Sequence, residues 1–492
     1  MDFPILLDSK SAEPLFIQLS KALKERIVSG GLAPGVALPP SRVLADSLDV
    51  SRGTVVKAYD DLIAQGYLES LTGSSTFVSK RGQLDRETQS EVEWKRNVET
   101  DGNFKLSLEA RKLMEMSLSE GTAGFQPELN YGAPPAEMLP LPQWKEILTA
   151  QCRRQQPHHF DCTPETLGSY KLRVEIATHL TRSKGLNCQP EQVIVFPGPQ
   201  RALANVAKIL IDAGDTVAVE DPGFGGGRDT FSDRGAKLIP IPIDQDGILV
   251  ERLEALNEPV KVVYVTPSCH DPTGAIMSLE RRQALLEWAS RRGAIIVEDG
   301  WDSDYTYSTA PIPSLQGLDR ENRVIYLYSF WKVLYPLTTV GCAVVPLSLV
   351  PIFDRVKFLT ERQSPILEHY ALAEFLRTGA LARHVKKTKV QYERRRKALV
   401  EAFYRLFKTD VEIPRQSAGL HLCIRFAPAL LRAGLLKAAE EAGLKLVSTK
   451  AYYSGSGRND EYLTPFADIT AEEITQRTEV LARLMKIPSR EV

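Results

Sequence analysis

Short apolar runs alternate with helix-forming segments between residues 190 and 345, and no other feature constrains the fold of this chain as strongly. The runs have the length and apolar character of buried strands. They are Val193–Phe196, Thr216–Val219, Val262–Thr266, Ala294–Val297, Val324–Tyr328 and Gly341–Val345. The stretches between them, such as Ser278–Arg291, have helical periodicity. We therefore predict an α/β layered domain with a largely parallel sheet, which binds ligands at the carboxyl ends of its strands.

Three of the predicted strands end in residues that could hold a charged cofactor. Asp299 follows one strand, and an anion there can pair with a protonated ring nitrogen. Ser329 and Lys332 follow another, and a lysine amine can condense with an aldehyde. The Gly-Pro-Gln turn at 198–200 follows a third and opens a helix, where backbone amides can hold phosphate. Each signal alone is weak, because a strand-end aspartate or a lone lysine is more often a cap or a surface residue.

The first eighty residues have a different pattern, with three helices followed by two short strands. Leu15, Leu19, Leu23 and Ile27 recur every four residues, and glycines stop this helix near residue 30. Two shorter helices follow, opened by serines at 41 and 51 whose hydroxyls can cap them. The pattern predicts a winged helix-turn-helix whose second short helix enters the DNA major groove. A three-helix packing unit with no role in DNA binding is the alternative.

Composition bounds the remaining possibilities. A chain of 492 residues is expected to form two or three domains. The net charge of -1 means that any DNA binding must come from a local arrangement. The six cysteines form no CxxC pair, which favours a reduced cytoplasmic compartment over a disulfide framework or a metal site. We expect neither a secretory signal nor a membrane span, because the chain has no suitable apolar stretch.

The amino-terminal motifs LPPSR, VSRGTV, AYDDL, GYL and TGSSTFV resemble the GntR-type winged-helix family over roughly residues 12–79. This resemblance implies contacts to DNA phosphates or bases from the two short helices and from the wing. The residues so implied are Arg42, Ser51, Arg52, Thr54, Lys57, Ser74 and Thr76. Ser75 stands where the family usually has glycine, which leaves the geometry of the wing tip open.

From about residue 104 to the end, the chain resembles fold-type I aminotransferases, and specifically the MocR/GabR group of GntR regulators. The motifs that carry this resemblance include LGSYKLRVEIATHL, PGPQRAL, EDPGFGGGR, TPSCHDPTG, IIVEDGWDSDY and SFWKVLYP. The resemblance implies large and small subdomains and pyridoxal 5'-phosphate as cofactor. Lys332 matches the lysine that binds this cofactor, and Asp299 matches the partner of its pyridine nitrogen. The other implied cofactor-binding positions are Phe224, Ser329, Gly198, Gln200, Trp301 and Asp271.

Several positions depart from the pattern of the group. Thr339 replaces an arginine that binds phosphate, and Leu463 replaces the arginine that binds a substrate carboxylate. Pro199 removes an amide donor from the phosphate turn. Trp301 replaces a tyrosine that reaches the cofactor's 3-oxygen, and Asp271 stands where this group has Phe or Tyr. Losing one charge-assisted phosphate contact typically costs about 1.5–3 kcal/mol. We therefore expect no catalytic residues and absent or vestigial transamination.

We interpret the chain as a DNA-binding transcription regulator. Residues 1–80 are expected to form the winged helix, 81–103 a charged linker, and 104–492 the aminotransferase-like domain for effector binding and dimerisation. The expected partners are a double-stranded DNA operator, a small-molecule effector and a second copy of the chain. Two alternatives stay open. One is a regulator whose degenerate pocket no longer binds pyridoxal phosphate, and the other is an active aminotransferase with an appended DNA-binding arm.

Overall fold

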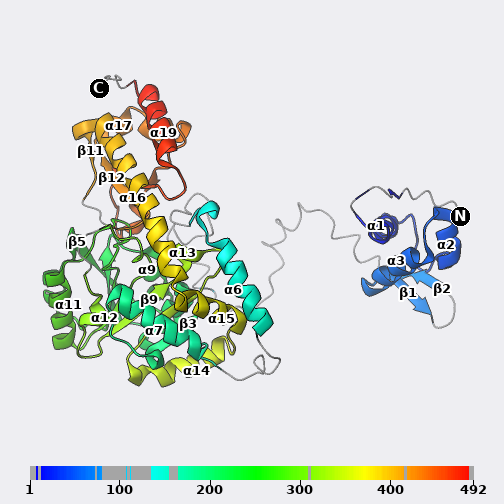
Figure 1. Ribbon diagram of the computed structural model, residues 1–492, viewed down its shortest axis with the longest axis horizontal. Coiled ribbons are helices and arrows are strands. Elements are labelled where there is room, and N and C mark those ends of the chain that lie inside the picture. The colour runs from blue at the N-terminus through cyan, green and yellow to red at the C-terminus, as the bar shows by residue number, and fades with distance from the viewer. Residues whose placement is uncertain are drawn as a thin grey trace. The chain divides into compact units, whose positions relative to one another are not determined.

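The computed structural model describes residues 13–71, 75–79, 134–154, 165–307, 312–414 and 418–486, together with Leu7, Asp8, Ser11, Ser107 and Arg111. The expected linker at 81–103 and Ser74 of the expected wing lie outside these residues. The chain divides into two compact units, Met1–Lys112 and Leu113–Val492, and each is described by itself (Figure 1).

The amino-terminal unit contains the three predicted helices and the two predicted strands. These are α1 (Leu15–Val28), α2 (Ser41–Leu48), α3 (Arg52–Ala64), β1 (Leu68–Leu71) and β2 (Ser75–Val78). The two strands pair antiparallel. The four-residue spacing of leucines in α1 places Leu19 and Leu23 in a core with Val55, Ala58 and Leu62 of α3. The buried stripe of α3 leaves its opposite face free to contact a ligand.

The two short helices begin in different ways. Ser51 caps α3, since its hydroxyl accepts a hydrogen bond from the Thr54 N–H at 3.1 Å. The expected cap at Ser41 is wrong. Pro40, whose ring restricts φ, occupies the entry position of α2, and Ser41 is its first helical residue. The Ser41 hydroxyl instead accepts a hydrogen bond from Arg52 Nε at 3.4 Å, which links α2 to α3.

The body is built on an eight-stranded sheet with strand order β3-β10-β9-β8-β7-β4-β5-β6. β4, β5, β7, β8 and β9 run parallel, whereas β10 is antiparallel to both β3 and β9. All six predicted runs form strands, so the prediction of a largely parallel sheet is confirmed. The strands are β3 (Val193–Phe196), β4 (Thr216–Asp221), β5 (Lys237–Asp244), β6 (Gly247–Ile248), β7 (Val262–Val265), β8 (Ile295–Asp299), β9 (Val324–Ser329) and β10 (Gly341–Val344).

Helices cover both faces of this sheet, which explains why its strands are apolar throughout. In β9, Tyr326 and Tyr328 pack against α7, α15 and α16, while Ile325 and Leu327 pack against α8 and α14. Helix α11 covers β4, β7 and β8 on the same side as α7. These helices are α7 (Tyr170–Lys184), α8 (Pro199–Leu210), α11 (Leu279–Arg292), α14 (Val350–Thr360), α15 (Ile366–Arg377) and α16 (Ala380–Phe407).

A smaller four-stranded antiparallel sheet with order β11-β12-β14-β13 forms the carboxy-terminal subdomain. The long helix α16 leads into it, and α19 packs along α16 (Figure 1). Its elements are β11 (Val411–Glu412), β12 (His421–Phe426), α17 (Pro428–Arg432), α18 (Leu435–Glu441), β13 (Val447–Ser448), β14 (Glu461–Pro465) and α19 (Ala471–Leu484). The expected large and small subdomains are therefore both present.

The remaining helices connect these layers. They are α6 (Leu141–Arg154), α9 (Gly225–Asp233), α10 (Val250–Glu254), α12 (Leu315–Leu318) and α13 (Trp331–Leu334). Across the described part of the chain, every helix is too short or too polar to cross a membrane.

Candidate cofactor site and DNA interface

The carboxyl ends of the parallel strands bring several predicted cofactor residues together. Asp299 ends β8, Ser329 ends β9, and Lys332 lies in the short helix α13 that follows. Asp271 lies in the loop after β7. Because neighbouring parallel strands end at the same edge of a sheet, these side chains share one region. Lys332 is 1% exposed and Asp271 is 2% exposed, so the site is a buried one.

The Lys332 ammonium is held by a carboxylate and an indole ring. Its Nζ lies 3.7 Å from Asp302 Oδ2 and 4.1 Å from the centroid of the Trp301 ring. A charge buried to this degree needs such partners. Asp302 is not one of the site residues that the motifs predict, although it lies only three residues beyond Asp299 in the same motif.

Asp299 is oriented by two hydrogen bonds. The Tyr264 hydroxyl donates to Oδ2 at 2.6 Å, and the Trp301 N–H donates to Oδ1 at 3.1 Å. Burial raises the pKa of Asp299 to about 6, and the hydrogen bonds from Tyr264 and Trp301 oppose that rise. This carboxyl can therefore pair with a cationic ring nitrogen. Tyr264 was not among the sequence-derived site residues, because it lies inside an apolar strand run.

The aromatic wall of the site consists of Phe224 and Trp301. Their ring centroids lie 5.5 Å apart with an interplanar angle of 28°, which is a stacked arrangement. A Cβ at Gly226 would lie 2.6 Å from the Phe224 ring, so a residue larger than glycine would displace that ring. The indole that replaces the family's tyrosine thus contacts both the aromatic ring and the lysine at the centre of the site.

The predicted phosphate turn opens α8. Gly198 is the residue before the helix and Pro199 is its first residue, so the turn contributes one N–H fewer than usual. The Gln200 side chain donates a hydrogen bond to Thr230 Oγ1 at 2.6 Å. The Thr339 carbonyl lies 3.7 Å from where a Cβ of Gly198 would be. Position 339 therefore adjoins the turn, as its expected role in phosphate binding requires, but carries no charge.

Ser329 contributes to the same edge of the sheet. Its hydroxyl accepts a hydrogen bond from the Trp331 N–H at 3.1 Å and is almost fully buried. This hydrogen bond lies in the turn between β9 and α13, and Lys332 is a residue of α13. Ser329 is thus close in sequence and in space to the lysine, while Gly198 and Gln200 approach from the other side of β10.

Leu463 occupies the position where a carboxylate-binding arginine is expected, and its surroundings are apolar as well. Leu463 of β14 is fully buried, lies opposite Cys423 in register, and packs with Cys423 and Tyr452. The Arg228 guanidinium donates to the backbone carbonyls of Ala451 and Tyr452, so it is held by the chain itself.

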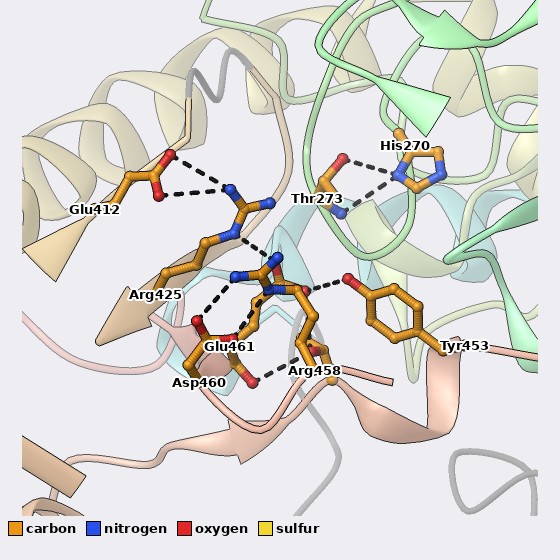
Figure 2. Close-up of polar contacts among 9 residues, drawn as sticks. His270, Thr273, Glu412, Arg425, Tyr453, Arg458, Asp460 and Glu461 are labelled. Atoms are coloured by element: carbon orange, nitrogen blue, oxygen red, sulfur yellow. Dashed lines mark hydrogen bonds and ion pairs between the residues drawn. The ribbon is translucent and has the colours of Figure 1, made fainter. Parts of the chain in front are cut away.

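Two arginines of the carboxy-terminal subdomain are ion-paired, as Figure 2 shows. Arg425 Nε lies 2.9 Å from the buried carboxylate of Glu461, and Arg458 lies 2.8 Å from Asp460. The Tyr453 hydroxyl also donates to Glu461, at 2.9 Å. These guanidinium groups are engaged in ion pairs within the subdomain.

The amino-terminal unit gathers part of the predicted DNA interface around one hollow of about 370 Å³. Arg42 of α2, Arg52 of α3 and Thr76 of β2 all line it. Lys57 is exposed on α3 and lies 5.9 Å from the ring of Phe16, away from the hollow. The Thr54 hydroxyl is hydrogen-bonded to Ser51 at 2.8 Å, so this pair also stabilises the start of α3.

Comparison with known proteins assigns both parts of the chain. Residues 17–78 match the family of bacterial regulatory proteins of the gntR type, and residues 128–477 match the aminotransferase class I and II family. A solved structure of kynurenine aminotransferase from Pyrococcus horikoshii superposes with a TM-score of 0.66 at 26% identity, covering 79% of this chain and 98% of that one. The fold and site thus define a GntR-type DNA-binding regulator with an aminotransferase-like body.

Two relatives match most of this chain. The chain is 35% identical over 440 residues to the probable rhizopine catabolism regulatory protein MocR of Rhizobium meliloti, covering 89% of this chain and 87% of that protein. It is 29% identical over 465 residues to the pyridoxine biosynthesis regulator PdxR of Corynebacterium glutamicum, covering 93% of each. The chain belongs to the MocR/GabR group of GntR transcription regulators, as the sequence motifs predict.

Proposed function

We propose that the body of this regulator binds pyridoxal phosphate at Lys332 and serves as a metabolite sensor without transaminase activity. The observation that carries this proposal is the convergence of the buried Asp299 and Lys332 at the ends of β8 and β9, next to Trp301, on which Phe224 from the loop after β4 stacks. These residues fit the cofactor, because Lys332 offers the amine and Asp299 an oriented carboxylate for the ring nitrogen. When bound, the cofactor supplies an aldehyde and an electron-withdrawing ring.

The same residues support sensing over catalysis. The Leu463 side chain has no charge or donor with which to bind an amino-acid carboxylate. The Trp301 indole can donate but not accept a hydrogen bond, whereas the tyrosine expected at this position can do both. Transamination also needs a group that moves protons at the substrate carbon. The Lys332 amine is the group placed for that step, but the substrate it would act on is not held in position.

Cofactor binding is tested by the visible absorbance of the full chain after titration with pyridoxal phosphate. We expect a new band that is lost in Lys332→Ala. Lys357→Ala is the matched control, because Lys357 is also buried, pairs with Glu361 at 2.5 Å and lies over an aromatic ring. No band in the unmodified chain, or an equal band in Lys332→Ala, would contradict the proposal.

A second candidate is a regulator whose pocket no longer accepts pyridoxal phosphate. The stacking of Trp301 on Phe224 favours it, because the indole covers the ring that would otherwise lie against the cofactor. Pro199 and Thr339 favour it as well, since both weaken the phosphate turn. The same titration separates the two candidates.

An active aminotransferase is the remaining alternative. We expect no turnover of common amino donors above that of free pyridoxal phosphate in a coupled assay, because position 463 cannot anchor a carboxylate. Turnover that depends on Lys332 would establish the alternative instead.

We further propose that residues 1–80 form the DNA-reading unit, that 81–103 connect it to the body at 104–492, and that the body forms a homodimer. The two reading units of the dimer then bind paired half-sites in one operator. Arg42, Arg52 and Thr76 line one hollow, which supports contact from this face. In gel-shift titrations with the protein's own promoter, Arg52→Ala should weaken binding by about 1–3 kcal/mol. Equal affinity for promoter and scrambled duplex would overturn the assignment.

A further inference from the structure

The region around Lys332 is rich in buried carboxyl groups. Asp271, Asp299 and Asp302 are 2%, 5% and 2% exposed, and Asp271 interacts electrostatically with both of the others and with Lys332. Lys184, a further cation that acts on Asp302, is already paired with Asp304 at 2.8 Å. The lysine of the site therefore faces several acids within the part of the chain that the structure describes.

Two of these acids have oxygen atoms without a hydrogen-bond donor. Neither carboxylate oxygen of Asp271 has a partner among the described residues, and the same holds for Asp302 Oδ1. A buried carboxylate without a donor is destabilising, whereas one that faces an ammonium group is stabilised by a charge-assisted hydrogen bond. Asp299 differs, because Tyr264 and the backbone of Trp301 already satisfy it.

The protein's own lysine shows how an ammonium group is accommodated here. Its Nζ lies near Asp302 and over the indole of Trp301, and a carboxylate combined with an aromatic face is suited to alkylammonium ions. Both carboxylate oxygens of Asp271 and Oδ1 of Asp302, which have no hydrogen-bond donor among the described residues, are available to a second cation while Lys332 keeps its charge.

A carboxylate ligand meets the opposite environment. Leu463 packs in an apolar cluster where the family has an arginine, and Arg228 and Arg425 are held by contacts within the chain. A ligand carboxylate brought into this site would face the acids of the cluster without a guanidinium partner from these residues.

We propose that the effector of this site is an organic cation, namely a primary amine that carries no carboxylate. Its ammonium group contacts Asp271 and Asp302, and Trp301 covers the adjacent carbon atoms. The inference deepens the proposed sensor function and rests on it, because it names the ligand class of the same site.

Binding of such an amine is coupled to proton release. Burial raises the pKa of Asp271 to about 7, and the charge of Lys332 opposes that rise. A second ammonium beside this carboxyl favours its ionised form. Near neutral pH, Asp271 therefore gives up a proton to the buffer as the amine binds, and this proton is measurable by calorimetry in buffers of different ionisation enthalpy.

The first test is rescue of Lys332→Ala in the full chain without added pyridoxal phosphate. This variant leaves the acids without their ammonium group. We expect butylamine and putrescine to raise its Tm more than that of the unmodified chain. γ-Aminobutyrate and N-butylacetamide, at equal ionic strength, should raise it little, because the first adds a carboxylate and the second lacks the charge.

The second test is calorimetric titration of the chain carrying Lys332 with the same compounds, and it applies even where Lys332→Ala does not fold. Asp271→Asn should weaken amine binding about ten- to hundred-fold and reduce the released proton. Asp468→Asn, at an exposed position, is the control and should leave binding unchanged. Preference for γ-aminobutyrate over butylamine, or equal amine affinity in Asp271→Asn, would overturn the proposal.

Failure of this inference is distinguishable from failure of the proposed function. Amine binding is measured without DNA and without cofactor, whereas the regulator is tested by gel shift and the cofactor by absorbance. If the chain bound its promoter and pyridoxal phosphate but did not bind amines, only the proposal of an amine effector would be wrong, and the proposed regulator function would stand.

Discussion

At the scale of single residues, the site is determined by which neighbour each charged group acquires. Lys332 has a carboxylate and an indole, and Asp299 has a tyrosine hydroxyl. Thr339 occupies a position beside the phosphate turn and contributes no charge. Substitutions at such positions should therefore change ligand affinity more than they change the fold.

Thr339→Arg should strengthen binding of pyridoxal phosphate. Position 339 is exposed and adjoins Gly198, so an added guanidinium can reach the phosphate without disturbing the core. One charge-assisted contact is worth about 1.5–3 kcal/mol, or roughly ten- to hundred-fold in Kd. Absorbance titration measures the change, and Thr339→Gln is the uncharged control. Equal affinity in both variants would show that position 339 does not reach the phosphate.

Glu220 should make the stability of the body depend on pH. Burial raises its pKa to about 8, although two hydrogen bonds from Thr266 oppose the rise. A folded state with a raised acid pKa binds more protons than the unfolded state, so this contribution to stability is present at low pH. It is lost as pH rises from the ordinary glutamate range towards 8.

Glu220→Gln should reduce that loss, because the amide has no proton to release. The measurement is Tm between pH 5 and pH 8, a range that brackets the titration of a raised carboxyl. We expect the unmodified chain to lose more Tm over this range than Glu220→Gln. Parallel curves for the two proteins would mean that Glu220 is already ionised throughout.

At the scale of elements, α3 combines a core-forming stripe with the exposed residues that we propose contact DNA. Its inward stripe builds the core of the amino-terminal unit, and its exposed side carries Arg52 and Lys57. Ser51 closes the first turn of the helix. A change at the cap therefore affects the presentation of the exposed residues as well as the stability of the helix.

Ser51→Ala should lower the free energy of unfolding of the amino-terminal unit by about 1 kcal/mol, because the Thr54 N–H loses its acceptor. Chemical denaturation followed by circular dichroism measures this loss. Ser51→Asp should restore most of the stability, since aspartate also caps helices well. If Ser51→Ala and Ser51→Asp were equally stable, the cap would not contribute.

The edge of the large sheet shows where element prediction from sequence fails. β5 was not predicted, because Pro240 and Pro242 interrupt an apolar run and proline is excluded from central strands. β6 pairs only with Ile243 and Asp244, so both prolines lie on a free edge, where a missing N–H is tolerated.

At the scale of the whole molecule, the chain joins a small reading unit with its own core to a larger body with an independent core. A ligand in the body influences DNA binding only if it favours one arrangement of the reading units over another. In the proposed homodimer, dimerisation through the body supplies the second reading unit that such an arrangement needs.

A fragment of residues 1–80 should therefore bind the operator much more weakly than the full chain. Two linked reading units gain affinity for the operator by roughly 10²–10⁴ over a single unit, because the second binding event is intramolecular. Gel-shift titrations of fragment and full chain measure the difference, and sedimentation establishes whether only the full chain is dimeric. A full chain that sediments as a monomer would contradict the proposed assembly.

Several features of this regulator follow from its sequence alone. Apolar runs specified the six strands from β3 to β4 in the sheet order, since a strand covered on both faces must be apolar throughout. Four-residue spacing specified α1, and motif order specified the family. These signals are local, so they can be read along the chain without knowing which segments meet in space.

The tertiary structure decided which side chains surround Lys332. Tyr264 reaches Asp299 from a neighbouring strand, Asp302 lies near the lysine, and Asp271 is buried without a donor from the described residues. No periodicity encodes these contacts, because burial, hydrogen bonding and pKa depend on segments that folding brings together from distant parts of the chain. The sequence therefore determined the class of protein, whereas packing determined the charge environment of Lys332.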